Sequence, residues 1–187
     1  MSHISHTLTH SAALARRALF ISAVLLAGLT IITSSLVFAD ELSLEQRVQR
    51  MEDEKEIRDL MSLYGQYLDA GNFSAYSQLF AKEGTWSGRT SNFEAIKGPA
   101  AIQATMEKAF ADRVYDPAKL GNLHLVSNIK IDVDGSDRAT GYAKYTVITR
   151  NENNEPYVRH IGRYEDVYIR EDGQWKFLSR LARREMP

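Results

Sequence analysis

The feature that most constrains the fold is a run of four long segments in the second half of the chain, in which apolar and polar residues alternate. These segments span residues 124–133, 138–150, 157–170 and 175–183. Alternation with period two is typical of strands that have one buried face. Asp134-Gly135 and Asp172-Gly173 separate two of the neighbouring pairs, and Asp-Gly is a strong hairpin signal. The pattern predicts a four-stranded antiparallel meander.

Helical periodicity precedes the meander. Between Ser43 and Ala70 apolar residues recur three or four positions apart, and Gly71 is suited to end a helix there. The rhythm breaks between Met51 and Ile57, so that the charged stretch in between is either an exposed turn of one long helix or a kink between two. Shorter helices are expected over residues 73–80 and 98–110, with a strand near 85–87 between them. Helices followed by an antiparallel meander predict an α+β domain.

The N-terminal stretch has the order of a secretion signal. Residues 1–39 contain no acidic residue, carry Arg16 and Arg17, and then run apolar up to Ala39. We predict a signal peptide over 1–39, cleaved after Ala39, and a mature domain over 40–187 in the periplasm or secreted. The alternative is an uncleaved N-terminal membrane anchor, because roughly 20 apolar residues also span a bilayer. The protein would then associate with a membrane.

Composition excludes several classes of function. The residues after position 39 hold 21 basic and 24 acidic side chains, and this net charge of −3 offers no concentrated basic face for nucleic acid. The chain has no cysteine, which excludes disulfides and thiolate chemistry. Neither a phosphate-binding glycine loop nor a nucleophile elbow is present. After position 39 no pair of histidines has metal-ligand spacing, so we predict neither a metal nor a cofactor.

Two histidines, His124 and His160, remain once the leader is removed. His124 lies near the start of the first meander strand, on the face that period two also gives to Asn128. Asp69 lies in the last turn of the long helix, where the helix dipole disfavours a carboxylate. If Asp69 faces His124, it would fix the imidazole tautomer and stabilise the charged ring of a general base. A half-buried structural histidine and a solvated helix end are the alternatives.

The segments EIRDLMSLYGQYLDAGNFSAYSQLFAKEGTW, HLVSN and GRYEDVYIREDGQWKFLSR occur in this order, and together they resemble the SnoaL-like branch of the NTF2-like superfamily. The resemblance covers residues 54–180. It implies a cone in which helices pack in the concave face of a curved antiparallel sheet around an apolar pocket. The branch includes scytalone dehydratase, bile acid 7-alpha-dehydratase and hexachlorocyclohexane dehydrochlorinase, which are cofactor-free lyases. Members commonly form homodimers or homotrimers.

The resemblance also assigns roles to individual residues. The helix-end aspartate of the family corresponds to Asp69 and its strand histidine to His124, while Tyr64 and Arg180 match further catalytic positions. Aromatic residues are ordinarily core, but the dehydrochlorinase has a tryptophan where Trp86 stands. The predicted sites are catalytic, at His124, Asp69, Tyr64 and Arg180, and substrate-binding, at Trp86, Asn128, Tyr145 and Tyr164.

The function expected from these features is that of a cofactor-independent lyase or isomerase, dehydratase-like, which acts on a small hydrophobic and cyclic molecule. His124 would remove a proton from carbon, and Asp69 would orient its ring. The alternative is a noncatalytic periplasmic module, either for small-molecule binding or as an accessory subunit, because one fold supports many functions.

Overall fold

The computed structural model describes residues 42–113 and 121–186, and the expected leader lies outside the described residues. The elements of the compact unit that begins at Ser43 are α2 (Leu44–Ala70), α3 (Phe73–Ser77), β1 (Phe80–Ser87), the 3-10 turn η1 (Arg89–Ser91), β2 (Ile96–Lys97), α4 (Pro99–Ala109), β3 (Asn122–Asp134), β4 (Arg138–Arg150), β5 (Pro156–Glu171) and β6 (Gln174–Met186). None of the described helices is long and apolar enough to cross a membrane.

Helix α2 is one uninterrupted helix, which settles the question of a kink. The Ser43 hydroxyl accepts a hydrogen bond from the main-chain N–H of Gln46, and the Gln46 side chain accepts one from Ser43 in return, so the capping box is formed. Gly71 ends the helix in the left-handed conformation. Met51 is 70% exposed and Ile57 is fully buried. The break in the hydrophobic rhythm therefore marks the point where α2 reaches the sheet.

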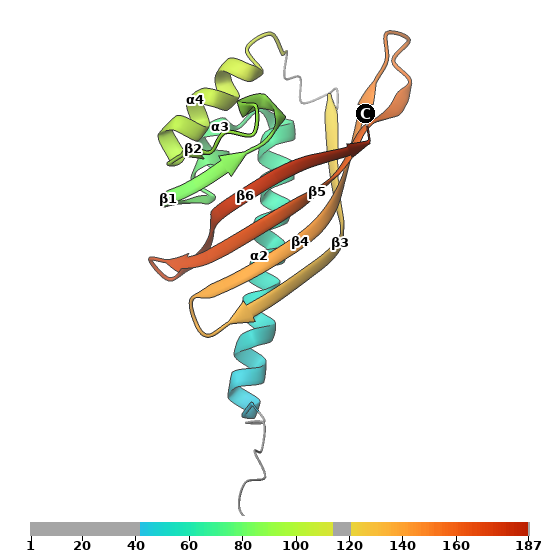
Figure 1. Ribbon diagram of the computed structural model, residues 1–187. Helices are drawn as coiled ribbons and strands as arrows, with labels where there is room; N and C mark the ends of the chain where they lie inside the picture. Colours follow the sequence, from blue (N-terminus) through green and yellow to red (C-terminus); the bar gives the residue numbers. More distant parts are fainter. Residues whose placement is uncertain (1–41, 114–120, 187) are drawn as a thin grey trace, which may run out of the picture. The chain divides into compact units, whose positions relative to one another are not determined.

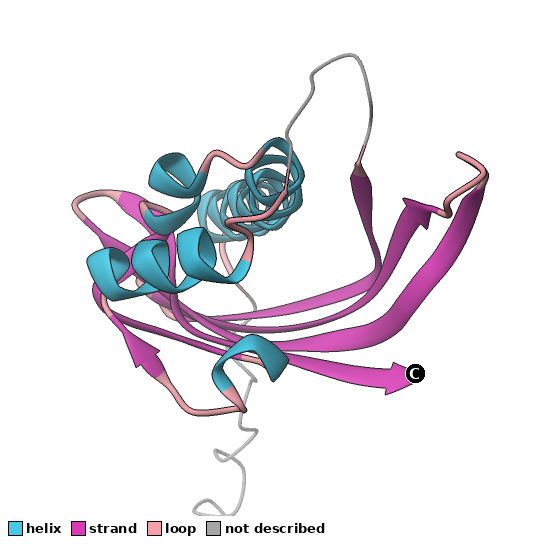
Figure 2. Ribbon diagram, turned by 90° about the horizontal axis from the view of Figure 1, so that it is seen from above, coloured by secondary structure: helices cyan, strands magenta, loops and turns pink. Residues whose placement is uncertain are grey.

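The six strands form one curved sheet in the order β2-β1-β6-β5-β4-β3. All neighbouring strands pair antiparallel except β1 and β6, which are parallel. Figure 1 shows α2 crossing the face of the sheet, and Figure 2 shows the sheet curving around this helix. The predicted α+β cone, with helices against a curved and mostly antiparallel sheet, is confirmed.

Several bulges interrupt the period-two pattern of the long strands, and two of them bear on the cavity. The first lies in β3 between Ser127 and Lys130, where Asn128 has a φ of 50°. The second lies in β5, where Arg159 is the extra residue between Val158 and His160. A bulge places two residues opposite one and bends the strand. Both bulges change which side chains reach the concave face.

The core between α2 and the sheet is rich in aromatic residues, and it also contains buried charges. Asp53 on α2 is 2% exposed and accepts hydrogen bonds from Arg170 and Trp175 on the sheet. Asp166 and Arg180 form a second pair, whose side chains are fully buried. Because an ion is costly to bury without a partner, the first pair fixes how α2 lies on the sheet.

Candidate functional site

Asp69 and His124 are in contact at one end of the sheet. One carboxylate oxygen of Asp69 lies 2.5 Å from Nδ1 of His124, and the other accepts the main-chain N–H of His124 at 2.7 Å. The two side chains are only 15% and 11% exposed. The strand approaches the helix this closely because Gly65 has no side chain: a Cβ there would lie 3.2 Å from Cβ of His124.

These two contacts determine the tautomer of His124. A carboxylate only accepts hydrogen bonds, so Nδ1 carries the proton and donates it to Asp69. The other ring nitrogen, Nε2, then holds a lone pair, and it makes no hydrogen bond to any residue in the described ranges. The arrangement is that of a general base whose orienting carboxylate would also stabilise the protonated ring.

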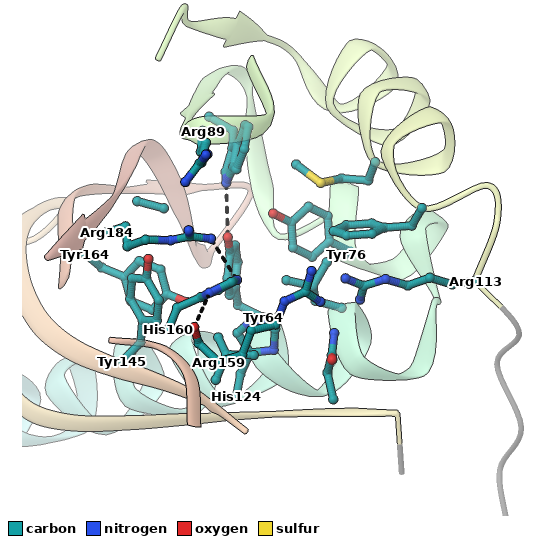
Figure 3. A pocket seen from close by; sticks show the side chains of 17 residues that line it. Tyr64, Tyr76, Arg89, Arg113, His124, Tyr145, Arg159, His160, Tyr164 and Arg184 are labelled. Carbon is teal, nitrogen blue, oxygen red and sulfur yellow. Dashed lines mark hydrogen bonds between the residues drawn. The ribbon is translucent and has the colours of Figure 1, made fainter. Parts of the chain in front are cut away.

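His124 lines a cavity of about 290 Å³ between α2, α4 and the sheet. Figure 3 shows the side chains around it, which come from both helices and from strands far apart in the sequence. Aromatic and apolar residues, basic residues and one asparagine line the cavity: Tyr64, Leu68, Tyr76, Trp86, Arg89, Met106, Phe110, Arg113, Asn122, His124, Tyr145, Val147, Arg159, His160, Tyr164, Ala182 and Arg184.

Tyr64 and Trp86 form a hydrogen-bonded pair in this cavity. The indole N–H of Trp86 lies 3.0 Å from the hydroxyl oxygen of Tyr64, and both residues are buried. Indole can only donate, so the Tyr64 oxygen is the acceptor. Its own proton therefore remains available to an oxygen atom of a bound molecule. Trp86 positions this hydroxyl in addition to lining the cavity.

Other tyrosines supply further hydroxyl groups. Tyr145 and Tyr164 stack at a centroid distance of 4.6 Å, and Tyr76 is completely buried. Burial raises the pKa of Tyr145, and it raises the pKa values of Tyr76 and Tyr164 well above the ordinary range. The three hydroxyl groups are thus neutral donors near pH 7.

The structure places Arg180 and Asn128 outside the cavity, in contrast to the sequence-based expectation. Arg180 is fully buried behind the cavity wall, paired with Asp166 through bonds of 2.9 and 2.7 Å. Its guanidinium stacks on the rings of Tyr64 and Tyr164 at 4.0 and 4.1 Å. It therefore supports two cavity residues from behind and has no access to a ligand. Asn128 lies exposed at the β3 bulge, which removes it from the face that His124 occupies.

Several cationic residues of the cavity were not predicted. Arg89, Arg113, Arg159 and Arg184 all contribute to the lining, as does His160. The bulge at Arg159 directs two consecutive residues of β5 toward the cavity, which alternation does not anticipate. Arg184 belongs to a basic cluster near the C-terminus, formed with Arg180 and Arg183. From the sequence alone this cluster is predicted to be a solvent-exposed edge. Only a known strand register could have shown otherwise.

His160 is held in a defined neutral state. Its Nδ1 lies 2.7 Å from the main-chain carbonyl oxygen of Arg159, and its Nε2 lies 3.0 Å from a guanidinium nitrogen of Arg184. A carbonyl oxygen only accepts and a guanidinium only donates, so the proton is on Nδ1 and Nε2 accepts. Partial burial lowers the pKa of His160, and the neighbouring Arg184 cation acts in the same direction. The ring links the main chain of β5 to Arg184.

Within the two described ranges no group of three histidine or acidic side chains could hold a metal ion. The residues that gather around the cavity are aromatic and basic instead. This set of side chains can surround an apolar ring, donate hydrogen bonds to oxygen and accept a proton at one imidazole.

Comparison with known proteins identifies the family. The sequence matches the SnoaL-like domain over residues 49–181, whereas no curated protein matches the chain. An NTF2-like protein with a cystatin-like fold from Novosphingobium aromaticivorans is similar, with 26% identity and a TM-score of 0.62 over 77% of this chain and 90% of that one.

Two more structures from the same organism share the fold. A candidate scytalone dehydratase has 24% identity and a TM-score of 0.62 over 75% of this chain and 89% of that one. The beta subunit of a candidate aromatic-ring-hydroxylating dioxygenase has 16% identity and a TM-score of 0.60 over 74% and 92%. The cone, the order of its elements and the match over most of the chain show that this protein belongs to the SnoaL-like domain family of the NTF2-like superfamily.

Proposed function

We propose that the protein is a cofactor-independent lyase or isomerase, dehydratase-like, for a small hydrophobic and cyclic molecule. The observation that carries this proposal is the clamp on His124: Asp69 holds both its Nδ1 and its main-chain N–H, while Nε2 belongs to a ring that lines the cavity. A purely structural histidine has no need of both contacts.

The proposed reaction begins when Nε2 of His124 takes a proton from a carbon next to a carbonyl group. The electron pair of that bond moves to the carbonyl oxygen, and the Tyr64 hydroxyl stabilises the resulting enolate by donating a hydrogen bond. In a lyase the enolate expels a hydroxyl group from the next carbon, which leaves as water with the proton held on His124. In an isomerase the same proton returns to a different carbon. Arg180 serves as a positioning residue beneath Tyr64.

The experiment is to follow a cyclic β-hydroxy ketone, such as 3-hydroxy-1-tetralone, by its absorbance as it loses water. His124→Gln should lower turnover roughly 100- to 10,000-fold, which is the usual contribution of a general base. Asp69→Asn should cause a large part of this loss, because its amide NH2 faces Nδ1 and favours the wrong tautomer. Exchange of the α-proton in D2O, followed by NMR, gives a second reading of the same step.

Asp132→Asn is the matched control, since Asp132 is exposed on β3 and pairs with Lys130. It should leave turnover unchanged. If His124→Gln and Asp69→Asn retain wild-type turnover, the dyad is structural. If ketones bind but neither react nor exchange protons, the protein is a binding or accessory module.

We also propose that the protein acts outside the cytoplasm, after cleavage behind Ala39. The support is the order of the N-terminal residues, with two arginines before a long apolar run and Asp40 immediately after it. Intact-mass analysis of the protein from its host should find Asp40 as the first residue. Finding the full-length chain in the membrane fraction would instead identify an anchor.

A homodimer or homotrimer is the proposed state in solution. Several apolar side chains are exposed on β3 and β5: Leu123, Leu125, Tyr157 and Val158, at 39%, 46%, 46% and 52%. The two strands lie on either side of β4, and exposed apolar residues in one region of a sheet often mark protein contacts. Light scattering coupled to gel filtration should give two or three times the monomer mass, and Leu125→Lys should reduce it.

A further inference from the structure

The cavity has an unbalanced charge. Four arginines line it, whereas no aspartate or glutamate does so among the residues that the structure describes. Asp69, which lies beside the cavity, is engaged with His124. Other arginines of the sheet do have acidic partners, as Arg163 has in Glu165 and Glu185 and Arg180 has in Asp166. What distinguishes the cavity is that its cations gather around one enclosed space with no acidic residue in the described lining.

Three of these arginines lack a carboxylate partner within the described part of the chain: Arg89, Arg159 and Arg184. Arg184 is half-buried, and its one hydrogen bond goes to the neutral ring of His160. Figure 3 shows this contact and the neighbouring Arg159 at the same end of the cavity. A neutral imidazole orients the guanidinium but does not neutralise it. The contact with His160 therefore fixes the orientation of the guanidinium and of its remaining N–H donors. The positive charge of Arg184 stays uncompensated.

Uncompensated cations in a cleft with low-dielectric walls attract anions, because such walls focus the electric field. A guanidinium also presents a planar fork of donors that matches a carboxylate or phosphate. The aromatic part of the same cavity, which includes Trp86, Tyr145 and Tyr164, suits a ring.

We propose that the ligand of this cavity is an organic oxyanion: an aromatic or alicyclic ring that bears a carboxylate or a phosphate ester, with the anionic group held by Arg184, Arg159 and Arg89. The proposal deepens the function proposed above and rests on it in so far as the bound molecule is a substrate. The acidic group anchors the molecule at the arginines, and its ring lies against the aromatic wall within reach of His124.

Matched sets of neutral and anionic probes test this. Binding of 1-naphthoate, 1-naphthyl phosphate and the neutral 1-naphthamide, together with the same three derivatives of biphenyl, is measured by titration calorimetry at low and high salt. At least one anion of each set should bind more tightly than the amide, and salt should weaken this preference. The stronger anion identifies the acidic group. Equal or tighter binding of the amides, or no binding of any anion, would overturn the proposal.

Arg184→Gln should lower the preference for the anion over the amide by about 10- to 100-fold, as expected for the loss of a charge-assisted hydrogen bond. Arg183→Gln is the matched control, because it removes the same charge from the next residue of β6, which does not line the cavity. It should leave the preference intact. If Arg184→Gln does not fold, the exposed Arg89→Gln and Arg159→Gln provide the same comparison.

His124→Gln separates this proposal from the catalytic one. It should lower turnover roughly 100- to 10,000-fold and still bind the anionic probes with the wild-type preference. Turnover of neutral ketones without any preference for anions would leave the proposed reaction standing and overturn the anion site. Anion binding without turnover would do the reverse.

Discussion

Replacing Arg180 with methionine tests whether this residue belongs to the core, as the structure indicates, or to the reacting surface, as its sequence position suggests. Its guanidinium is completely buried, donates two hydrogen bonds to Asp166 and lies 4.0 Å from the ring of Phe177 as well as over two tyrosines. Arg180→Met keeps much of the volume and removes the charge. Asp166 would then be a buried carboxylate whose remaining partner is the Tyr168 hydroxyl, at 2.8 Å.

The loss of one partner from a buried ion pair typically costs about 3 to 5 kcal/mol, since the other charge remains desolvated. For a domain of this size, each kcal/mol lowers the melting temperature by about 2 to 4 °C. We therefore expect Arg180→Met to melt about 6 to 20 °C below the wild type. Urea unfolding followed by circular dichroism provides the free energy of unfolding directly.

A double substitution separates the charge from the packing. Arg180→Met combined with Asp166→Asn removes both charges, yet leaves an acceptor for the Tyr168 hydroxyl. It should be more stable than Arg180→Met alone. Arg183→Met is the surface control, with a half-exposed side chain 3.5 Å from Glu165, and should change stability by less than about 0.5 kcal/mol. The reasoning is refuted if Arg180→Met matches this control, or if the double variant is the less stable of the two.

Three further predictions concern the cavity. Nitrogen-15 NMR should find His160 as the neutral tautomer with its proton on Nδ1 and with a pKa below the usual 6.5. As the pH falls, the His160 ring of the unfolded chain is protonated before that of the folded protein. The contribution of His160 to stability is therefore complete above about pH 6.5 and is lost as the pH falls through the lower pKa of the folded state. Gly65→Ala places a methyl group 3.2 Å from Cβ of His124. The overpacking should cost about 1 to 3 kcal/mol in urea unfolding, offset by the roughly 0.5 to 1 kcal/mol that alanine gains over glycine inside a helix. Gly121→Ala, with open space around it, should cost little. Trp86→Phe removes the hydrogen bond to Tyr64 and should cost about 1 kcal/mol or more, with the Tyr64 ring signals of the NMR spectrum shifted.

The architecture could be predicted because its signals are local. Asp172-Gly173 reads as a two-residue turn, and both residues do adopt positive φ, at 53° and 78°. The capping box at Ser43 and the left-handed Gly71 likewise set the ends of α2 where the sequence indicates. The family and the α+β cone follow from these elements and their order. The exposure of Leu44 and Met51 differs from a simple amphipathic reading, because the first turns of α2 extend beyond the sheet.

The composition of the cavity could not be predicted to the same extent, because it depends on strand register. Strict alternation puts Asn128 on the face of His124, yet the bulge in β3 turns it out to solvent. The bulge in β5 has the opposite effect and brings Arg159 in beside His160. Period two is informative only while the ladder is regular. Arg159 and His160 lie beside an irregularity of the ladder, whereas His124 lies in its regular part.

Two carboxylates near the cavity, the partly buried Asp69 and the buried Asp166, explain why its charge is positive. Asp69 accepts a hydrogen bond from His124, and Asp166 accepts hydrogen bonds from Arg180 and Tyr168. Asp69 orients the base His124, and Asp166 holds the Arg180 guanidinium beneath Tyr64. Neither carboxylate is left to balance the charge of Arg184. The contacts of Asp69 with His124 and of Asp166 with Arg180 thus orient the cavity walls and also use both carboxylates. The cavity therefore favours a ligand that carries a negative charge.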